Sequence, residues 1–294
     1  MNNVSESLAG RVGIINLNSF TYSEINKVKN KKLFDPITLN KVPKISVNKI
    51  FEIIFRGGMP RLYMEQEMST NLYFQGYIDT YISRDVKLLT QVGNESSFRK
   101  FIVSVASKTG EQLNYTTLAN DAGISVPTAI NWLSILTTSG LVYLLEPFMS
   151  SSLKRLTHIP KIIFMDTGLA CYLSGFSSAK ELQMSSNSGH FLESFIISEI
   201  VKSYNAKGIR PNISYYRDKE KNEIDLLFYK NDTLFPFEIK KTALPTKEMI
   251  KNFKKIKNHG KKIGQGGIIC FYDTLTKLDD DNYIVPISSV VNNH

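Results

Sequence analysis

The sequence predicts a mixed α+β fold in which a helical N-terminal half is followed by an α/β domain built on a sheet. Three observations carry this prediction. Residues 49–138 contain segments of helical periodicity, and residues 223–240 alternate apolar and polar side chains as strands do. Residues 266–272, GGIICFY, form a short apolar run that is typical of a buried strand.

The first 90 residues are predicted to form an N-terminal unit and a connector. Residues 1–48 contain a short polar helix, an apolar strand-like run at Val12–Leu17 and a capped helix start at Ser19–Ile25. Residues 49–90 carry helical periodicity that breaks at Gly57-Gly58. This pattern predicts two helices around a Gly-Pro turn.

Residues 91–156 are predicted to form a winged helix-turn-helix. FRKFIVSVAS gives a first helix and Tyr115–Asp121 a second, Gly123 marks the turn, and Ser125 caps a third helix. LVYLLEPF then begins a wing, so the third helix takes the position that reads a major groove. Because it holds no Lys or Arg, DNA contact and a packing or self-association role both stay open. Basic contacts could come from Lys154 and Arg155.

Residues 222–241 are predicted to form a β-hairpin with Asn231-Asp232 at its turn. The apolar pairs of this register are Ile224 with Ile239, Leu226 with Phe237, and Phe228 with Phe235. The same register places Asp225 opposite Glu238, with Lys240 on the same face. Two carboxylates beside an ammonium suit Mg²⁺, whereas the simpler alternative is a solvated strand face.

A lysine-rich stretch follows the hairpin. Residues 240–262 contain nine lysines and one glutamate, and residues 246–259 have the spacing of an amphipathic helix. The candidate nucleic-acid contacts on it are Lys247, Lys251, Lys254 and Lys255. A solvated helix face is the alternative. A Ser-rich stretch at residues 174–189 is the expected flexible joint before the sheet domain.

Asp225, followed on the next strand by Glu238-Ile239-Lys240, resembles the PD-(D/E)XK nuclease superfamily. The resemblance implies a restriction-endonuclease-like α/β domain over residues 157–294, with Asp225 and Glu238 binding Mg²⁺ or Mn²⁺ and Lys240 beside the attacking water. A third acid normally comes from the preceding helix, where FLESFIISEI offers Glu193 and, as the second choice, Glu199. Ile224 stands where the motif has proline.

Four further segments resemble a prokaryotic family of AAA-like ATPases with a C-terminal domain of unknown function, of the DUF4143 type. They are SESLAGR, GGMP, YIDTYISRDV and MDTGLACYL. The resemblance implies that residues 1–48 are a remnant of the ATPase module. The chain contains no G-x-x-x-x-G-K-[ST] loop, so we expect no ATP binding from it alone. A separate ATPase partner and self-association both stay open.

Net charge, cysteine content and hydrophobicity indicate which classes of partner the protein binds. A net charge of +9 favours a polyanion, and nucleic acid is the leading candidate. The chain has only two cysteines and no apolar run near the roughly 20 residues of a membrane span, which predicts a cytoplasmic protein without a membrane partner. The expected function is nucleic-acid binding with Mg²⁺-dependent phosphodiester cleavage. The alternatives are a non-catalytic binding module on the same fold and a regulatory half that docks to an ATPase.

Overall fold

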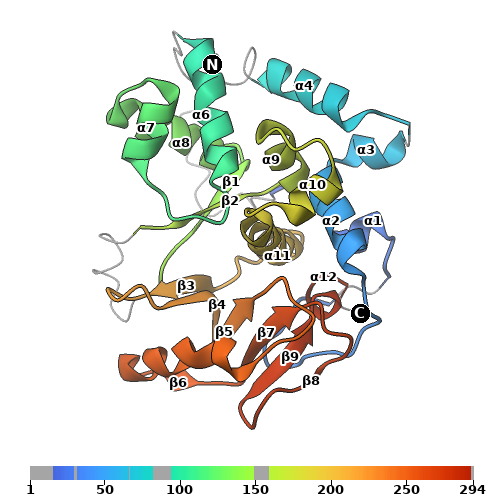
Figure 1. The fold of residues 1–294 in the computed structure, drawn as a ribbon, viewed down its shortest axis with the longest axis vertical. Coiled ribbons are helices and arrows are strands. Elements are labelled where there is room, and N and C mark those ends of the chain that lie inside the picture. Colours follow the sequence, from blue (N-terminus) through green and yellow to red (C-terminus); the bar gives the residue numbers. More distant parts are fainter. Residues whose placement is uncertain (1–15, 30–31, 66, 82–93, 149–158, 293–294) are drawn as a thin grey trace, which may run out of the picture.

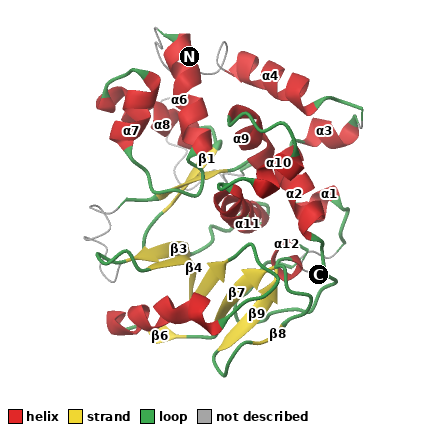
Figure 2. Cartoon of the chain, in the orientation of Figure 1, coloured by secondary structure: helices red, strands yellow, loops and turns green. Residues whose placement is uncertain are grey.

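The computed structural model describes residues 16–29, 32–65, 67–81, 94–148 and 159–292. Figure 1 shows most of the helices gathered at one end of the molecule and the strands of the main sheet at the other, with helix α11 (Ser188–Asn205) between them. Figure 2 shows the same division by secondary structure. The mixed α+β fold expected from the sequence is confirmed.

The N-terminal part is helical. Helix α1 spans Tyr22–Ile25 and starts with a capping box in which Thr21 and Glu24 exchange hydrogen bonds. Up to Tyr81, where the described part of the connector ends, it holds three helices where two were expected: α2 (Val47–Arg56), α3 (Pro60–Met64) and α4 (Thr70–Thr80). Gly57 ends α2 at a φ of 75°, Pro60 begins α3, and Ser69 caps α4, so the chain restarts twice.

The next elements are the three expected helices and a strand, but the strand that pairs with it lies at residues 161–164, outside the predicted winged-helix segment of residues 91–156. Helices α6 (Glu95–Ser107), α7 (Tyr115–Ala122) and α8 (Val126–Thr138) precede strands β1 (Val142–Leu145) and β2 (Lys161–Phe164), which pair antiparallel. Gly123 takes the left-handed conformation that ends α7, and the Ser125 hydroxyl caps α8. The winged-helix assignment stays a prediction. Lys154 and Arg155 lie outside the described residues.

Residues 174–189 do not form the expected flexible joint. They contain α10 (Ala179–Met184), which packs against α2 and buries Leu182. The preceding helix α9 (Thr167–Leu173) is capped by Asp166, whose side chain accepts a hydrogen bond from Leu169 N. Asp166 also accepts a 2.9 Å hydrogen bond from Gly58 N, and a Cβ at Gly57 would lie 2.3 Å from Asp166 Oδ1. The GGMP and MDTG segments therefore pack directly on each other.

The main sheet has the strand order β3-β4-β5-β7-β9-β8, with β6 pairing β5. Its strands are β3 (Ile213–Arg217), β4 (Glu223–Lys230), β5 (Thr233–Ile239), β6 (Lys262–Ile263), β7 (Gly266–Cys270), β8 (Thr276–Lys277) and β9 (Asn282–Pro286). β5, β7 and β9 run parallel, while β3, β4 and β8 pair antiparallel with their neighbours. The central, buried position expected for β7 is confirmed.

The hairpin β4–β5 has most of the predicted register. Asn231 and Asp232 have φ values of 52° and 55°, as a two-residue turn requires, and the pairs of Leu226 with Phe237 and Phe228 with Phe235 form. The prediction for Ile224 is wrong. A bulge in β4 lets two residues of β3 span three of β4, since Ser214 pairs Leu227 while Tyr216 pairs Ile224.

The bulge turns Ile224 to the opposite face from Leu226. Ile224 joins a core cluster with Ile256 and Ile268, whereas Leu226 and Ile239 belong to the cluster on the α11 side. Both faces of the hairpin are therefore covered, and β5 is buried along its whole length, not half-buried as expected. Asp225 lies within the bulged stretch of β4, between Ile224 and Leu227.

The lysine-rich segment forms a 3₁₀ helix, η3 (Lys247–His259), where the sequence suggested an ordinary amphipathic helix. Its apolar residues Ile250, Phe253 and Ile256 recur every third position and are buried against the sheet. A 3₁₀ helix has three residues per turn, so this spacing places all three side chains on one ridge. The lysines remain on the outer sides.

The larger core cluster contains residues from Tyr22 to Val291, the latter in helix α12 (Ser288–Val291). It thus includes side chains from all four predicted segments, whose boundaries stay a prediction. Within the described residues, no helix combines the length and the apolar character needed to cross a membrane.

Candidate active site

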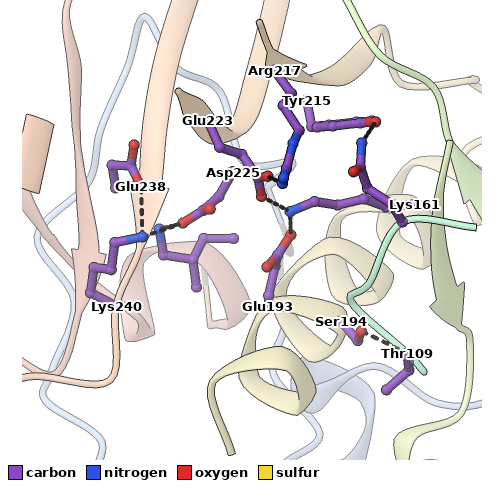
Figure 3. A network of polar contacts seen from close by, with 12 residues as sticks. Thr109, Lys161, Glu193, Ser194, Tyr215, Arg217, Glu223, Asp225, Glu238 and Lys240 are labelled. Carbon is purple, nitrogen blue, oxygen red and sulfur yellow. Dashed lines mark hydrogen bonds and ion pairs between the residues drawn. The ribbon is translucent and has the colours of Figure 1, made fainter. Parts of the chain in front are cut away.

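The structure brings together three of the four predicted catalytic residues. Lys240 Nζ lies 2.8 Å from Asp225 Oδ2 and 2.6 Å from Glu238 Oε2, so one ammonium bridges two carboxylates (Figure 3). Asp225 and Glu238 are only 7% and 2% exposed, while the Lys240 side chain is 36% exposed. The ammonium therefore stands on the solvent side of a buried carboxylate pair. We call Asp225, Glu238 and Lys240 the carboxylate cluster.

Asp225 is held as a carboxylate. Its Oδ2 also accepts a 2.8 Å hydrogen bond from Ile239 N, two residues beyond the last β4–β5 pair, Leu226 with Phe237. Burial alone would raise its pKa, but the positive charges of Lys240 and Lys161, together with these hydrogen bonds, keep the pKa of Asp225 below its ordinary value.

In the pair of Asp225 and Glu238, it is Glu238 whose ionised form is destabilised. Burial, and next the charge of Asp225, raise the pKa of Glu238 to about 9 in spite of its contact with Lys240. Its Oε1 atom is buried and accepts no hydrogen bond from any described residue. Two carboxylates thus share one ammonium and leave one buried oxygen without a partner, an arrangement that a second cation or a proton would complete.

Glu193, the expected third acid, projects from α11 toward this site but is paired with Lys161. Lys161 Nζ lies 2.6 Å from Glu193 Oε1 and 2.6 Å from Glu223 Oε1, and Arg217 pairs with Glu223 on the other side (Figure 3). Burial raises the pKa of Glu193 to about 7, although Lys161 opposes the shift. We call these four residues the Lys161 network.

Sequence reasoning missed Lys161, Glu223 and Arg217. Lys161 is 2% exposed, and the nearby carboxylates of Glu193, Asp225 and Glu223 outweigh its burial and raise its pKa. Its ammonium lies 5.3 Å from the Tyr215 ring centroid, which adds a cation–π contact. A signal existed in the sequence: in KIIF a lysine opens an otherwise wholly apolar strand, and such a lysine needs buried partners.

Glu199, the second choice for the third acid, lies elsewhere. Its Oε2 accepts a 2.7 Å hydrogen bond from Tyr22 N, and its Oε1 lies 2.7 Å from Lys202 Nζ. It therefore fastens the N-terminal segment to α11 and is not part of the carboxylate cluster.

The lysines predicted to contact nucleic acid lie on the outer sides of η3. Lys247, Lys251 and Lys254 line a groove of 670 Å³ whose opposite wall contains Asp279, Asp280 and Asp281. Lys251 also pairs with Glu248 at 2.7 Å. Lys255, exposed as well, lies outside this groove. The η3 surface is thus less uniformly basic than the sequence of the helix alone suggests.

The cluster offers two carboxylates to a metal. Among the described residues, no group of three or more His, Cys, Asp or Glu side chains is arranged to hold a metal ion. Mg²⁺ commonly uses one or two carboxylates and keeps several waters, so Asp225 and Glu238 fit its needs. The unpartnered Glu238 Oε1 is the observation that supports the fit.

Comparisons with known proteins give relatives without an assigned function. Uncharacterized proteins of Mycobacterium tuberculosis (Rv2008c) and Mycobacterium bovis (Mb2031c) are each 27% identical over 244 residues, covering 82% of this chain and 50% of the relative. The chain thus spans about half the length of these curated relatives. No solved structure matches it significantly.

Two family models match adjoining parts of the chain. Residues 47–180 match the model described as Domain of unknown function (DUF8612), and residues 188–290 match Domain of unknown function (DUF4143). The second match confirms the expected DUF4143 resemblance. Lys161 lies in the first region, and its partners Glu193 and Glu223 lie in the second. Over residues 188–290, which include every residue of the carboxylate cluster, the chain is therefore similar to the DUF4143 family.

Proposed function

We propose that Asp225, Glu238 and Lys240 form a divalent-metal site that hydrolyses phosphodiester bonds of nucleic acid. The observation that carries the proposal is the convergence of two buried carboxylates on one ammonium, with Glu238 Oε1 left without a partner. The resemblance of these positions to the PD-(D/E)XK pattern and the net charge of +9 support the choice of substrate.

Each residue has a role that follows from its place. Asp225, kept ionised and fixed by Ile239 N, and Glu238, with its free oxygen, would hold Mg²⁺ or Mn²⁺. The bound ion would supply positive charge against the charge that develops on the attacked phosphate. Lys240 stands at the exposed side of the pair, where its ammonium can contact the phosphate and orient the attacking water. Glu193 stays with Lys161 and is a positioning residue.

Cleavage and metal binding test the proposal together. Wild-type protein incubated with Mg²⁺ or Mn²⁺ should cut a single-stranded, duplex or branched DNA or RNA substrate, and EDTA should stop the reaction. Asp225→Asn should cut none of them, because it removes one of two ligand charges. A wild type that cuts nothing and shows no metal-dependent stabilisation would refute the proposal.

A non-catalytic binding module is the second candidate, and one observation favours it. Glu193, the expected third acid, already forms an ion pair with Lys161 at 2.6 Å. The carboxylates of Asp225 and Glu238 are almost fully buried. On this reading the three charged residues stabilise the fold, and the chain binds nucleic acid or protein without cutting it. Nucleic-acid binding that survives in EDTA, together with no cleavage and no response to metal, would establish this candidate.

The longer relatives bear on the context of the site. We propose that the chain works together with an AAA-like ATPase module, because SESLAGR, GGMP and MDTGLACYL resemble that family and the matched region covers only 50% of each relative. The three-helix and strand-pair unit of residues 95–164 would then contact nucleic acid or a second copy of the chain. Co-purification of the chain with an ATPase encoded beside it tests the first part.

A further inference from the structure

A second groove, distinct from the carboxylate cluster, lies at the other end of strand β4. It has a volume of 700 Å³, within the range of about 300–1,000 Å³ that is usual for ligand sites. Its walls are the segment 32–40, the end of α11 with the loop that follows, and residues 228–230 of β4. Asp225 lies near the start of that strand, so the groove and the cluster lie at opposite ends of β4.

The groove is lined mainly by basic side chains. Its cationic side chains are Lys32, Lys207, Arg210 and Lys230, and its one acidic side chain is Asp35. Four positive charges and one negative charge give a net +3. Asp35 is neutralised by Lys230 at 2.7 Å, while the other three cations form no ion pair with any residue that the structure describes. The groove differs in this respect from the one beside η3, where three aspartates face the lysines.

Two tyrosines also line the groove, and hydrogen bonds fix both rings. Tyr204 OH donates to Phe34 O at 3.0 Å, and Tyr229 OH donates to Asp232 Oδ1 at 2.6 Å. Lys261 Nζ lies 5.2 Å from the centroid of the Tyr229 ring and 2.7 Å from Asp232 Oδ1, so this ion pair further holds the ring without adding net charge. Fixed rings lose little conformational freedom when a planar group stacks on them.

We propose that this groove binds a single-stranded nucleic acid, with phosphates contacting Lys32, Lys207 and Arg210 and bases stacking beside Tyr204 and Tyr229. A basic channel that follows the backbone, combined with aromatic rings for the bases, is how proteins bind single strands without sequence preference. A duplex offers its phosphates but not its base faces. The inference shares with the proposed function only the class of ligand, because binding here requires neither metal nor cleavage.

The test is binding of a fluorescein-labelled oligothymidylate, measured by fluorescence anisotropy in EDTA so that cleavage plays no part. The double variant K207A/R210A should bind about tenfold or more weakly at low salt. Each phosphate contact contributes about 0.7 to the slope of log affinity against log salt concentration, so the variant should lose about 1.4 of that slope. Tyr229→Ala should weaken binding about tenfold with little change in slope.

The matched control is K180A/K277A, which removes two exposed lysines from α10 and from β8 at the opposite edge of the sheet. It should bind as the wild type does. Equal affinity of K207A/R210A and wild type, equal losses in both double variants, or tighter binding of duplex than of single strand would overturn the inference. Lys32→Glu, on another wall, repeats the test if K207A/R210A does not fold. Asp225→Asn should bind normally, so loss of cleavage and loss of binding remain distinguishable.

Discussion

At the scale of single residues, Lys240 bridges Asp225 and Glu238, and its removal should lower the stability of the protein. Lys240→Ala leaves two buried carboxylates without their shared ammonium, and breaking such a pair costs about 3 kcal/mol or more. We expect a lower melting temperature in EDTA and a larger rise on addition of Mg²⁺ than in wild type, because the ion then replaces the missing cation. Cleavage should stop.

Lys230→Ala is the matched control for this change. Lys230 forms an exposed ion pair with Asp35 at the other end of the same strand, and such pairs contribute at most about 1 kcal/mol. Thermal unfolding with and without MgCl₂ distinguishes the two variants. If Lys240→Ala behaves like Lys230→Ala, the carboxylate pair does not depend on Lys240.

The raised pKa of Glu193 gives a pH-dependent prediction. Because its pKa is about 7 in the folded protein against an ordinary 4.5, the native state keeps a proton that the unfolded chain releases between these pH values. The free energy of unfolding therefore falls as pH rises through this window, by about 1.4 kcal/mol per pKa unit. Glu193→Gln removes this dependence, so it should equal wild type near pH 4.5 and be more stable at pH 8.

Urea unfolding at several pH values measures this difference. Glu248→Gln, an exposed glutamate on η3, should follow the wild-type pH dependence and serves as the control. A stability difference between Glu193→Gln and wild type that stays constant with pH would show that Glu193 does not hold the proton.

The sequence identified the cluster but not its neighbours. Glu238 and Lys240 could be predicted to lie together because alternation places residues two apart on one face of a strand. Asp225 was expected directly opposite Glu238, but the β4–β5 pairs end at Leu226 with Phe237, and Asp225 reaches Lys240 from the bulged end of β4. The partner of Glu193 could not be predicted. Glu193 lies on helix α11, whereas Lys161 lies 32 residues earlier, in the two-stranded sheet β1–β2. Contacts of this kind depend on how elements pack, and no local periodicity encodes them.

At the scale of elements, the turn of the hairpin β4–β5 follows from the local sequence pattern, whereas the bulge in β4 does not. The turn at Asn231-Asp232 and the pairs near it follow from alternation and turn chemistry. The bulge next to Asp225 does not, because Ile224 is apolar and suits either face of the strand. Only the pairing with β3, which shifts between Ser214 and Tyr216, reveals the extra residue. Bulges often re-aim a side chain, and here the proposed metal ligand Asp225 lies directly beside one.

The η3 helix offers a prediction about its outer surface. Changing Lys251, Lys254 and Lys255 together to Glu should weaken nucleic-acid binding equally for all sequences and lower its salt dependence, because these side chains could contact only phosphates. Folding should be unaffected, since all three are exposed. Anisotropy titrations with several oligonucleotides check both points. Unchanged affinity would mean that η3 is only a solvated face over the apolar ridge of Ile250, Phe253 and Ile256.

At the scale of the whole molecule, one hydrophobic core joins segments that the sequence separates. The Ser-rich stretch looked like a linker because of its composition, yet α10 within it packs on α2. The composition of a segment does not show which distant elements pack on it. Leu182 in α10 is buried, and α10 packs on α2, more than 100 residues earlier in the chain. The three helices α6 to α8 and the hairpin β4–β5 were predictable, but α10, β3 and the packing of all segments around the larger core cluster were not.

ATP binding tests the account of the chain as a whole. No loop of the G-x-x-x-x-G-K-[ST] type occurs in the sequence, so backbone amides, lysine and hydroxyl are not arranged to hold a triphosphate. Calorimetry of this chain with ATP and Mg²⁺ should show no binding in the micromolar range. Micromolar affinity would contradict the assignment of the nucleotide site to a separate module.

The most direct test of the central claim is thermal unfolding of EDTA-treated protein with increasing MgCl₂ or MnCl₂. A ligand at about one hundred times its Kd stabilises the native state by about 2.7 kcal/mol, so the wild-type melting temperature should rise by several degrees. Asp225→Asn should show no rise, and Asp232→Asn, which changes an exposed carboxylate on the same hairpin, should rise as wild type does. A wild type that does not respond to metal, or an Asp225→Asn variant that responds equally, would contradict a metal site at Asp225 and Glu238.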